Sequence, residues 1–258
     1  MMTTSHIITD DDVAFDSCSV IPFFQKIVSV AADKKEKCEG IEILARIKKG
    51  DQYLSPANFS CQSYTPNTLN KLTSVLLCKT LSHIEKTLNK PNFISFNVYA
   101  RQLQMNTIRC LIDTLSSLYS EFESRGIQLV MEITENEKLE TIDGVMDTLR
   151  LINKIGIKIA IDDYGKYFSS PSMVSFVEDV HILKIDKSII DSLEVNCLIS
   201  RSFIKHAFDI AKIKNCHILI EGIERESQLE LLGNNVNHST IWYQGYFFSR
   251  PRPIHDLK

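Results

Sequence analysis

The sequence predicts an α/β barrel with eight strands, a TIM-like (β/α)8 fold whose first two strands are antiparallel. Eight short β-prone segments alternate with longer stretches of helical periodicity, a pattern typical of α/β folds with a mostly parallel sheet. Eight such strands in 258 residues favour a closed barrel over an open sheet. The first connection, "AADKKEKCE", is too short for a crossover helix, which predicts the antiparallel pair.

The eight predicted strands follow in order along the chain. They span residues 19–30, 40–47, 92–99, 127–134, 157–163, 181–187, 217–223 and 240–248. Between them, stretches such as 65–88 and 141–156 place apolar residues at i, i+3, i+4 and i+7, as amphipathic helices do. The second of these stretches begins with Thr141 and closes on Gly156, which predicts the start and the end of one helix.

Composition narrows the class of protein. A net charge of −3 and an isoelectric point near 6.2 leave no basic surface for nucleic acid. The chain contains no apolar run of 18 residues, no signal-peptide layout and no CxxC pair, so we expect a cytoplasmic protein with reduced cysteines and no membrane contact. Residues 1–15 are predicted to be a poorly ordered extension, and residues 16–258 a single barrel domain.

Polar side chains stand near the carboxyl end of seven of the eight strands. Active sites of barrel enzymes are built at this end, from the ends of several strands. In chain order the polar residues are Glu42, Arg46, Asn97, Glu132, Glu135, Asp162, Asp163, Lys184, Asp186, Glu221 and Gln244.

One acid at a strand end is ordinarily a helix cap or half of a surface ion pair, and Glu135 or Asp186 alone would be read so. Five carboxylates in one mouth are different, because their repulsion would raise several pKa values unless cations compensated it. Arg46 and Lys184 supply too little positive charge, so the sequence predicts divalent metal. Oxygen ligands favour Mg²⁺ or Mn²⁺. The adjacent aspartates suit a pair of ions, the usual device for displacement at phosphorus, where Arg46 would hold a phosphate oxygen.

The same residues lie in motifs that resemble the EAL-domain phosphodiesterases, which hydrolyse the bacterial second messenger cyclic di-GMP. The resemblance runs from about Phe23 to Pro253. "FFQKI" is similar to the opening Q-P-I stretch, and "EILAR" stands where E-A-L-x-R stands. "NVYARQL", "EITE", "DDYG", "KIDKSII", "EGIE" and "QGYFFSRP" follow in the family's order.

The resemblance implies a TIM-like barrel that converts cyclic di-GMP to linear pGpG with two divalent ions. One ion would be held by Glu42, Asn97, Glu132 and Asp162, and the second by Asp162, Asp163 and Glu221. It implies a catalytic set of Glu42, Asp163, Lys184 and Glu221, in which Lys184 orients the attacking water. The nucleotide would contact Gln25, Arg46 and Gln244, and the loop after the fifth strand would be stabilised by Glu135. Mg²⁺ or Mn²⁺ would support turnover, whereas Ca²⁺ would inhibit it because its bonds are longer and its geometry looser.

The chain departs from the family pattern after "DDYG", where it reads "KYFSS" in place of T-G-Y-S-S. Tyr167 replaces a glycine, which puts the loop's backbone and its link to the expected homodimer in doubt. Two other functions stay open from sequence alone: a receptor that binds cyclic di-GMP without cleaving it, and a protein-interaction module that controls a regulatory partner. Turnover with and without Mg²⁺ separates the enzyme from both.

Overall fold

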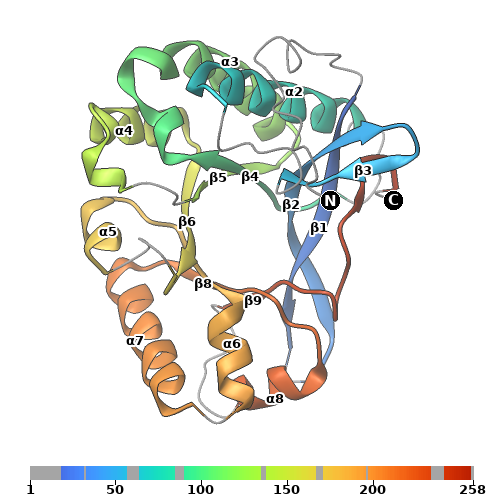
Figure 1. Cartoon of the computed structure of the whole chain (residues 1–258), viewed down its shortest axis with the longest axis vertical. Coiled ribbons are helices and arrows are strands. Elements are labelled where there is room, and N and C mark those ends of the chain that lie inside the picture. The colour runs from blue at the N-terminus through green and yellow to red at the C-terminus, as the bar shows by residue number, and fades with distance from the viewer. Residues whose placement is uncertain are drawn as a thin grey trace, which may run out of the picture.

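A computed structural model of the chain describes residues 19–31, 33–56, 64–84, 90–134, 138–166, 171–195, 197–233 and 241–256. Within these ranges eight strands close into a barrel (Figure 1). In order around the ring they are β1 (Val20–Val30), β2 (Glu36–Lys49), β4 (Phe93–Tyr99), β5 (Gln128–Thr134), β6 (Lys158–Tyr164), β7 (Ile182–Ile185), β8 (His217–Ile220) and β9 (Ile241–Tyr243). The predicted fold class is confirmed.

The strand β1 is the reversed member of the ring. It pairs antiparallel with β2 on one side and with β9 on the other, whereas the remaining neighbours in the ring are parallel. The reversal follows from the short connection after Val30, in which the Ala31 N–H donates to the Lys35 carbonyl at 2.9 Å. Because the other seven strands run in one direction, their carboxyl ends meet at one end of the barrel.

Helices cover the outside of the ring (Figure 1). They are α2 (Pro66–Ile84), α3 (Met105–Glu123), α4 (Val145–Ile155), α5 (Pro171–Phe176), α6 (Lys187–Glu194), α7 (Leu198–Lys214) and α8 (Glu226–Gly233). Short 3₁₀ turns are η3 (Ala100–Leu103), η4 (Leu139–Thr141) and η6 (Ile254–Asp256). No helix in the described ranges is long and apolar enough to cross a bilayer.

The prediction that a helix begins at Thr141 is wrong, although its end at Gly156 is confirmed. Thr141 closes the 3₁₀ turn η4, where its hydroxyl donates to the Lys138 carbonyl at 2.7 Å. The helix α4 begins only after Gly144, which has a φ of 67°. A Cβ at this glycine would lie 2.8 Å from the Cβ of Met105, so close packing against the start of α3 also favours glycine here.

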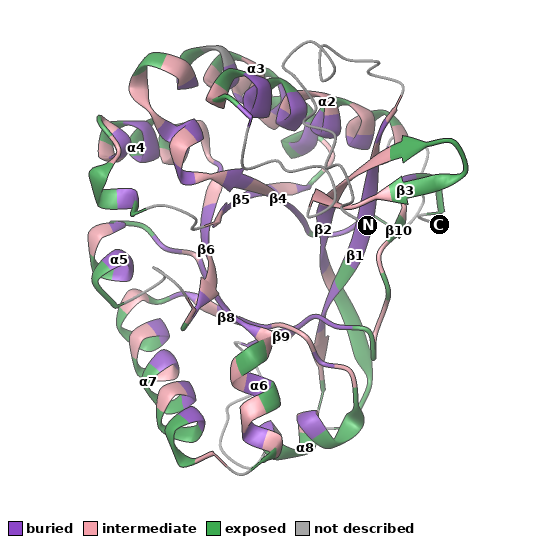
Figure 2. Cartoon of the chain, viewed as in Figure 1, coloured by how far each residue is buried: buried purple, intermediate pink, exposed green. Residues whose placement is uncertain are grey.

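The barrel interior is apolar at the end opposite the polar strand ends. Its small cluster is formed by Ile27, Phe93, Val130, Ala160, Ile182 and Leu219, with Trp242 packed against it. The Phe93 ring occupies the space beside Gly40, where a Cβ would lie 2.4 Å from that ring, so this position requires glycine. The larger core lies between the outer face of the strands and the helices, where Figure 2 shows purple faces turned inward. The apolar end therefore closes the barrel and leaves its other end for polar groups.

Two further strands were not predicted. The strand β3 (Gln52–Leu54) pairs with the end of β2 across a turn at Gly50, whose φ is 60°. The strand β10 (Arg252–Pro253) pairs with β1 at Phe23 and Phe24. Both lie outside the ring, β3 paired with β2 and β10 with β1, so they extend the sheet without changing the barrel.

Candidate active site

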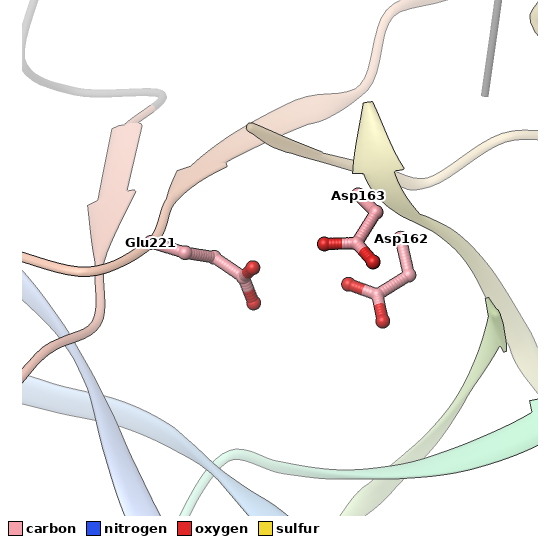
Figure 3. A group of neighbouring side chains, drawn as sticks. All are labelled: Asp162, Asp163 and Glu221. Atoms are coloured by element: carbon pink, nitrogen blue, oxygen red, sulfur yellow. The ribbon is translucent and has the colours of Figure 1, made fainter. Parts of the chain in front are cut away.

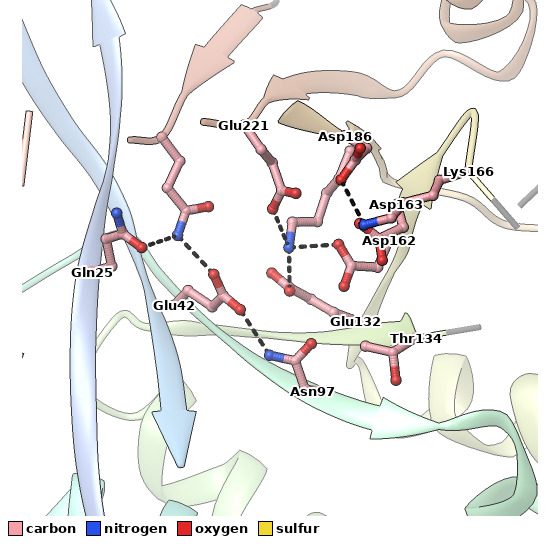
Figure 4. Close-up of polar contacts among 12 residues, drawn as sticks. Gln25, Glu42, Asn97, Glu132, Thr134, Asp162, Asp163, Lys166, Asp186 and Glu221 are labelled. Carbon is pink, nitrogen blue, oxygen red and sulfur yellow. Dashed lines mark hydrogen bonds and ion pairs between the residues drawn. The ribbon is translucent and has the colours of Figure 1, made fainter. Parts of the chain in front are cut away.

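The structure brings together the polar residues predicted at the strand ends. Side chains from around the ring converge in the barrel mouth (Figure 4). They belong to Gln25, Glu42, Asn97, Glu132, Asp162, Asp163, Lys184, Glu221 and Gln244. Glu135 and Tyr167 lie outside the described residues.

Lys184 stands at the centre of this cluster, with 1% of its side chain exposed. Its Nζ lies 2.6 Å from Glu132 Oε2, 2.8 Å from Asp162 Oδ1 and 2.8 Å from Glu221 Oε1. The position follows from strand alternation, because Ile182 in the apolar floor and Lys184 one step higher share the inward face of β7. One buried ammonium group therefore contacts three carboxylates and can balance the charge of only one.

Glu42 is held by amides rather than by this lysine. Its Oε1 accepts from Asn97 Nδ2 and its Oε2 from Gln244 Nε2, each at 2.7 Å. Gln244 Nε2 also lies 3.3 Å from Gln25 Oε1, and Gln25 Nε2 donates to the Ser249 carbonyl. The buried Gln244 Oε1 has no hydrogen-bond partner among the described residues, so it can accept a bond from water or from a ligand.

Asp162 and Asp163 both face the mouth, which simple alternation along a strand forbids. A bulge explains it: β6 advances three residues from Ile161 to Tyr164 while β7 advances two. Asp163 takes the extra place with a φ of 51°, in the left-handed region. Figure 3 shows the result, with both aspartates on β6 and Glu221 opposite them. Ligand oxygens of these three carboxylates lie within 4.8 Å of one another.

Burial, together with the crowding of acids, raises the pKa of three of these carboxyl groups. Burial, opposed by Lys184, raises the pKa of Glu132 to about 8. Burial and the adjacent Asp162 carboxylate raise the pKa of Asp163 to about 7, and burial raises the pKa of Glu221 well above its usual value. Burial opposes the charge on Lys184, but Asp162, Glu132 and Glu221 together raise its pKa. A cation bound here would favour the ionised carboxylates.

Two more charged groups complete the mouth. Asp186 caps α6 and accepts from the Ser188 N–H at 2.9 Å, as predicted for an isolated strand-end acid. Lys166, which sequence reasoning did not place in the site, lies 3.3 Å from Asp186 Oδ2 and 3.8 Å from Asp163 Oδ1. When all are ionised, six carboxylates and two ammonium groups leave four net negative charges, the charge that two divalent cations neutralise.

Beside the cluster lies a cavity of about 330 Å³. Glu42, Glu221, Gln25 and Gln244 line it together with residues that the sequence analysis did not single out, namely Lys187, Glu224 and Tyr246. Lys187 forms an ion pair with Glu224, and half of Tyr246 is exposed. Their only sequence signal was membership of the "KIDKSII", "EGIE" and "QGYFFSRP" motifs.

Arg46 is not among the groups that contact the carboxylate cluster. Its guanidinium lies 5.4 Å from the centre of the Phe23 ring and donates to the Ala45 carbonyl at 2.7 Å. Burial lowers the pKa of Arg46, opposed by interactions with Tyr246 and Glu42. Arg46 therefore lies four residues beyond Glu42 on β2, outside the carboxylate cluster.

Fold and site together define an α/β-barrel protein whose polar end carries a hard, oxygen-rich centre suited to divalent cations. A family model described as "EAL domain" matches residues 12–251. The chain belongs to the EAL domain family, as its motifs had indicated.

Curated relatives agree with this membership. The chain is 28% identical over 250 residues to the probable cyclic di-GMP phosphodiesterase PdeG of Escherichia coli, covering 95% of this chain and 47% of that protein. It is 27% identical over 220 residues to the cyclic di-GMP phosphodiesterase RocR of Pseudomonas aeruginosa, covering 83% of this chain and 53% of RocR. The chain thus spans about half the length of these relatives.

Solved structures support the fold. The crystal structure of an EAL domain protein from Listeria monocytogenes superposes with a TM-score of 0.77 at 24% identity, covering 100% of this chain and 97% of that one. The YkuI protein of Bacillus subtilis, solved with its substrate cyclic di-GMP and calcium, gives a TM-score of 0.73 at 22% identity, covering 95% of this chain and 59% of that one.

Proposed function

We propose that this chain is a metal-dependent phosphodiesterase that hydrolyses cyclic di-GMP to linear pGpG. What supports this most strongly is the cluster of Asp162, Asp163 and Glu221, whose oxygens lie within 4.8 Å of one another in a mouth with excess negative charge. Family membership and the cyclic di-GMP phosphodiesterase names of PdeG and RocR point to the same substrate. The chain retains each of the ligand types that the family pattern asks for.

The residues present fit two divalent ions. Asp162, Asp163 and Glu221 form one group of close carboxylates, and Glu42, Asn97 and Glu132 stand on the neighbouring strands β2, β4 and β5. We assign Glu42, Asn97, Glu132 and Asp162 to one ion, and Asp162, Asp163 and Glu221 to the other. When bound, Mg²⁺ or Mn²⁺ would activate water and stabilise charge on the phosphate.

Lys184 has a defined task in this scheme. Its ammonium group carries three hydrogen-bond donors, all of which now face carboxylates at 2.6–2.8 Å. Once cations compensate those carboxylates, a donor of Lys184 can hold the oxygen of the attacking water. Water then adds to one phosphorus, the bond from phosphorus to O3′ breaks, and O3′ takes up a proton to give the linear dinucleotide.

The remaining side chains bind and orient the nucleotide. Gln244 offers a buried oxygen without a partner in the described structure, and Gln25 is fixed beside it by Ser249. The guanidinium of Arg46, four residues beyond Glu42 on β2, suits a phosphate oxygen. Glu135 keeps its proposed role in stabilising the loop after β6. A homodimer, a cytoplasmic location and a regulatory protein partner remain sequence predictions.

The proposal is tested with purified protein stripped of metal and supplied with cyclic di-GMP. Linear pGpG should appear with Mg²⁺ or Mn²⁺, and neither with chelator nor with Ca²⁺ alone. Binding of cyclic di-GMP without product in Mn²⁺ would instead favour the receptor function.

A further inference from the structure

Lys166 is a charged group at the metal-binding mouth that the EAL pattern does not supply. It follows Gly165 directly after "DDYG", at the position where the pattern has threonine. Its Nζ lies 3.3 Å from Asp186 Oδ2 and 3.8 Å from Asp163 Oδ1 (Figure 4). The chain therefore holds a second ammonium group beside its acidic cluster.

The backbone of Lys166 and the Asp186 partner of its ammonium group are both held by hydrogen bonds. The Lys166 N–H donates to the Asp163 carbonyl at 3.0 Å, which closes the turn after β6. Asp186 is held by Ser188 at the start of α6, through both its N–H and its hydroxyl. The lysine thus connects the turn that carries Asp163 to a rigid helix start.

A purely structural role explains little of this arrangement. The Lys166 side chain is 37% exposed, and ion pairs that solvent reaches contribute little to stability. Its charge, in contrast, acts directly on the carboxylate that the proposed second ion requires. A unit positive charge beside Asp163 opposes the approach of any further cation.

We propose that the charge of Lys166 lowers the affinity of the site formed by Asp162, Asp163 and Glu221 for a divalent cation. The inference rests on the proposed function. This site is then the more weakly binding of the two. If solvent screens the charge about as well as bulk water, removing it should strengthen binding of the ion there about tenfold. Lys166 acts here through Asp163 and does not itself touch the reacting atoms.

The test is a titration of metal-stripped protein with Mn²⁺, in which electron paramagnetic resonance reports the free ion. Lys166→Met removes the charge and Lys166→Arg retains it. Lys154→Met makes the same charge change at an exposed position on α4 and serves as the matched control. Thermal melts check folding, and Lys166→Thr provides a second neutral variant if the methionine variant does not fold.

We expect the neutral variants to bind the weaker Mn²⁺ about tenfold more tightly than the wild type, with the arginine and Lys154 variants within about twofold of it. Neutral variants with wild-type or weaker Mn²⁺ affinity would overturn the inference and leave the proposed phosphodiesterase standing. A wild type that binds no Mn²⁺ would overturn both, so the two failures are distinguishable.

Discussion

Replacing Lys184 with methionine should destabilise the metal-free protein strongly. Methionine has a similar length and no charge, so the substitution leaves Glu132, Asp162 and Glu221 without the ammonium group that now lies 2.6–2.8 Å from each. Removing one partner of a buried ion pair ordinarily costs about 3–5 kcal/mol, because the remaining charge stays in a low-dielectric site.

The pH modulates this loss. Lys184 lowers the pKa of both Glu132 and Glu221, so its removal raises these values further and lets the two carboxyl groups keep their protons instead of standing uncompensated. Because burial raises the pKa of Glu132 to about 8 even beside Lys184, the stability lost by the variant should be small at pH 6 and grow as the pH rises through 8, up to about 3–5 kcal/mol. In a chain of this size it corresponds to a fall of about 10 °C in Tm.

Urea unfolding followed by circular dichroism, in EDTA at pH 6 and pH 8, measures this directly. Mn²⁺ should restore much of the stability of Lys184→Met, because a cation takes over the compensation of the carboxylates. Lys154→Met is the control and should remain within about 0.5 kcal/mol of the wild type. A Lys184→Met variant as stable as the wild type at pH 8 in EDTA would refute the compensating role of Lys184.

Three further outcomes follow from the same geometry. Glu42→Ala should abolish formation of pGpG while Tm stays close to that of the wild type, since the partners of Glu42 are amides rather than charged groups. Loss of the fold would show that Glu42 has a structural role instead. In EDTA the wild type should lose stability relative to Glu132→Gln as pH rises from about 5 to 8. The reason is that the folded chain holds the Glu132 proton up to a pKa of about 8, whereas an unfolded chain releases it near 4.5. A constant difference in stability across that range would contradict the raised pKa of Glu132. Gly40→Ala should cost about 1–3 kcal/mol by forcing the Phe93 ring aside, and Phe93→Leu should relieve part of that cost; equal stability of Gly40→Ala and the wild type would show that the barrel floor yields.

Most of the fold could be predicted because the strand pattern is local. The segment 92–99, for example, was expected as a strand, and the structure has Phe93–Tyr99. Placement of the site also followed, since parallel strands in register bring residues such as Asn97 and Glu132 opposite one another. Nothing more than alternation and chain direction was required for these steps.

The rest depended on contacts that the sequence does not display. Alternation alone would have turned Asp163 away from Asp162, and only the bulge with its left-handed backbone brings both to the mouth. Lys166 pairs with Asp186 twenty residues later, through a turn and a helix start that belong to different units of the barrel. The start of α4 was missed because Gly144 packs against Met105, a contact between two helices.

The most direct test of the central claim is a time course of the nucleotide products from cyclic di-GMP, separated by chromatography, with purified metal-stripped protein in Mg²⁺, Mn²⁺, Ca²⁺ or chelator. Accumulation of linear pGpG in Mg²⁺ and Mn²⁺, suppressed by Ca²⁺ and absent in chelator, is the predicted result. Unchanged cyclic di-GMP at high protein concentration in Mn²⁺ would contradict the claim that this barrel is a phosphodiesterase.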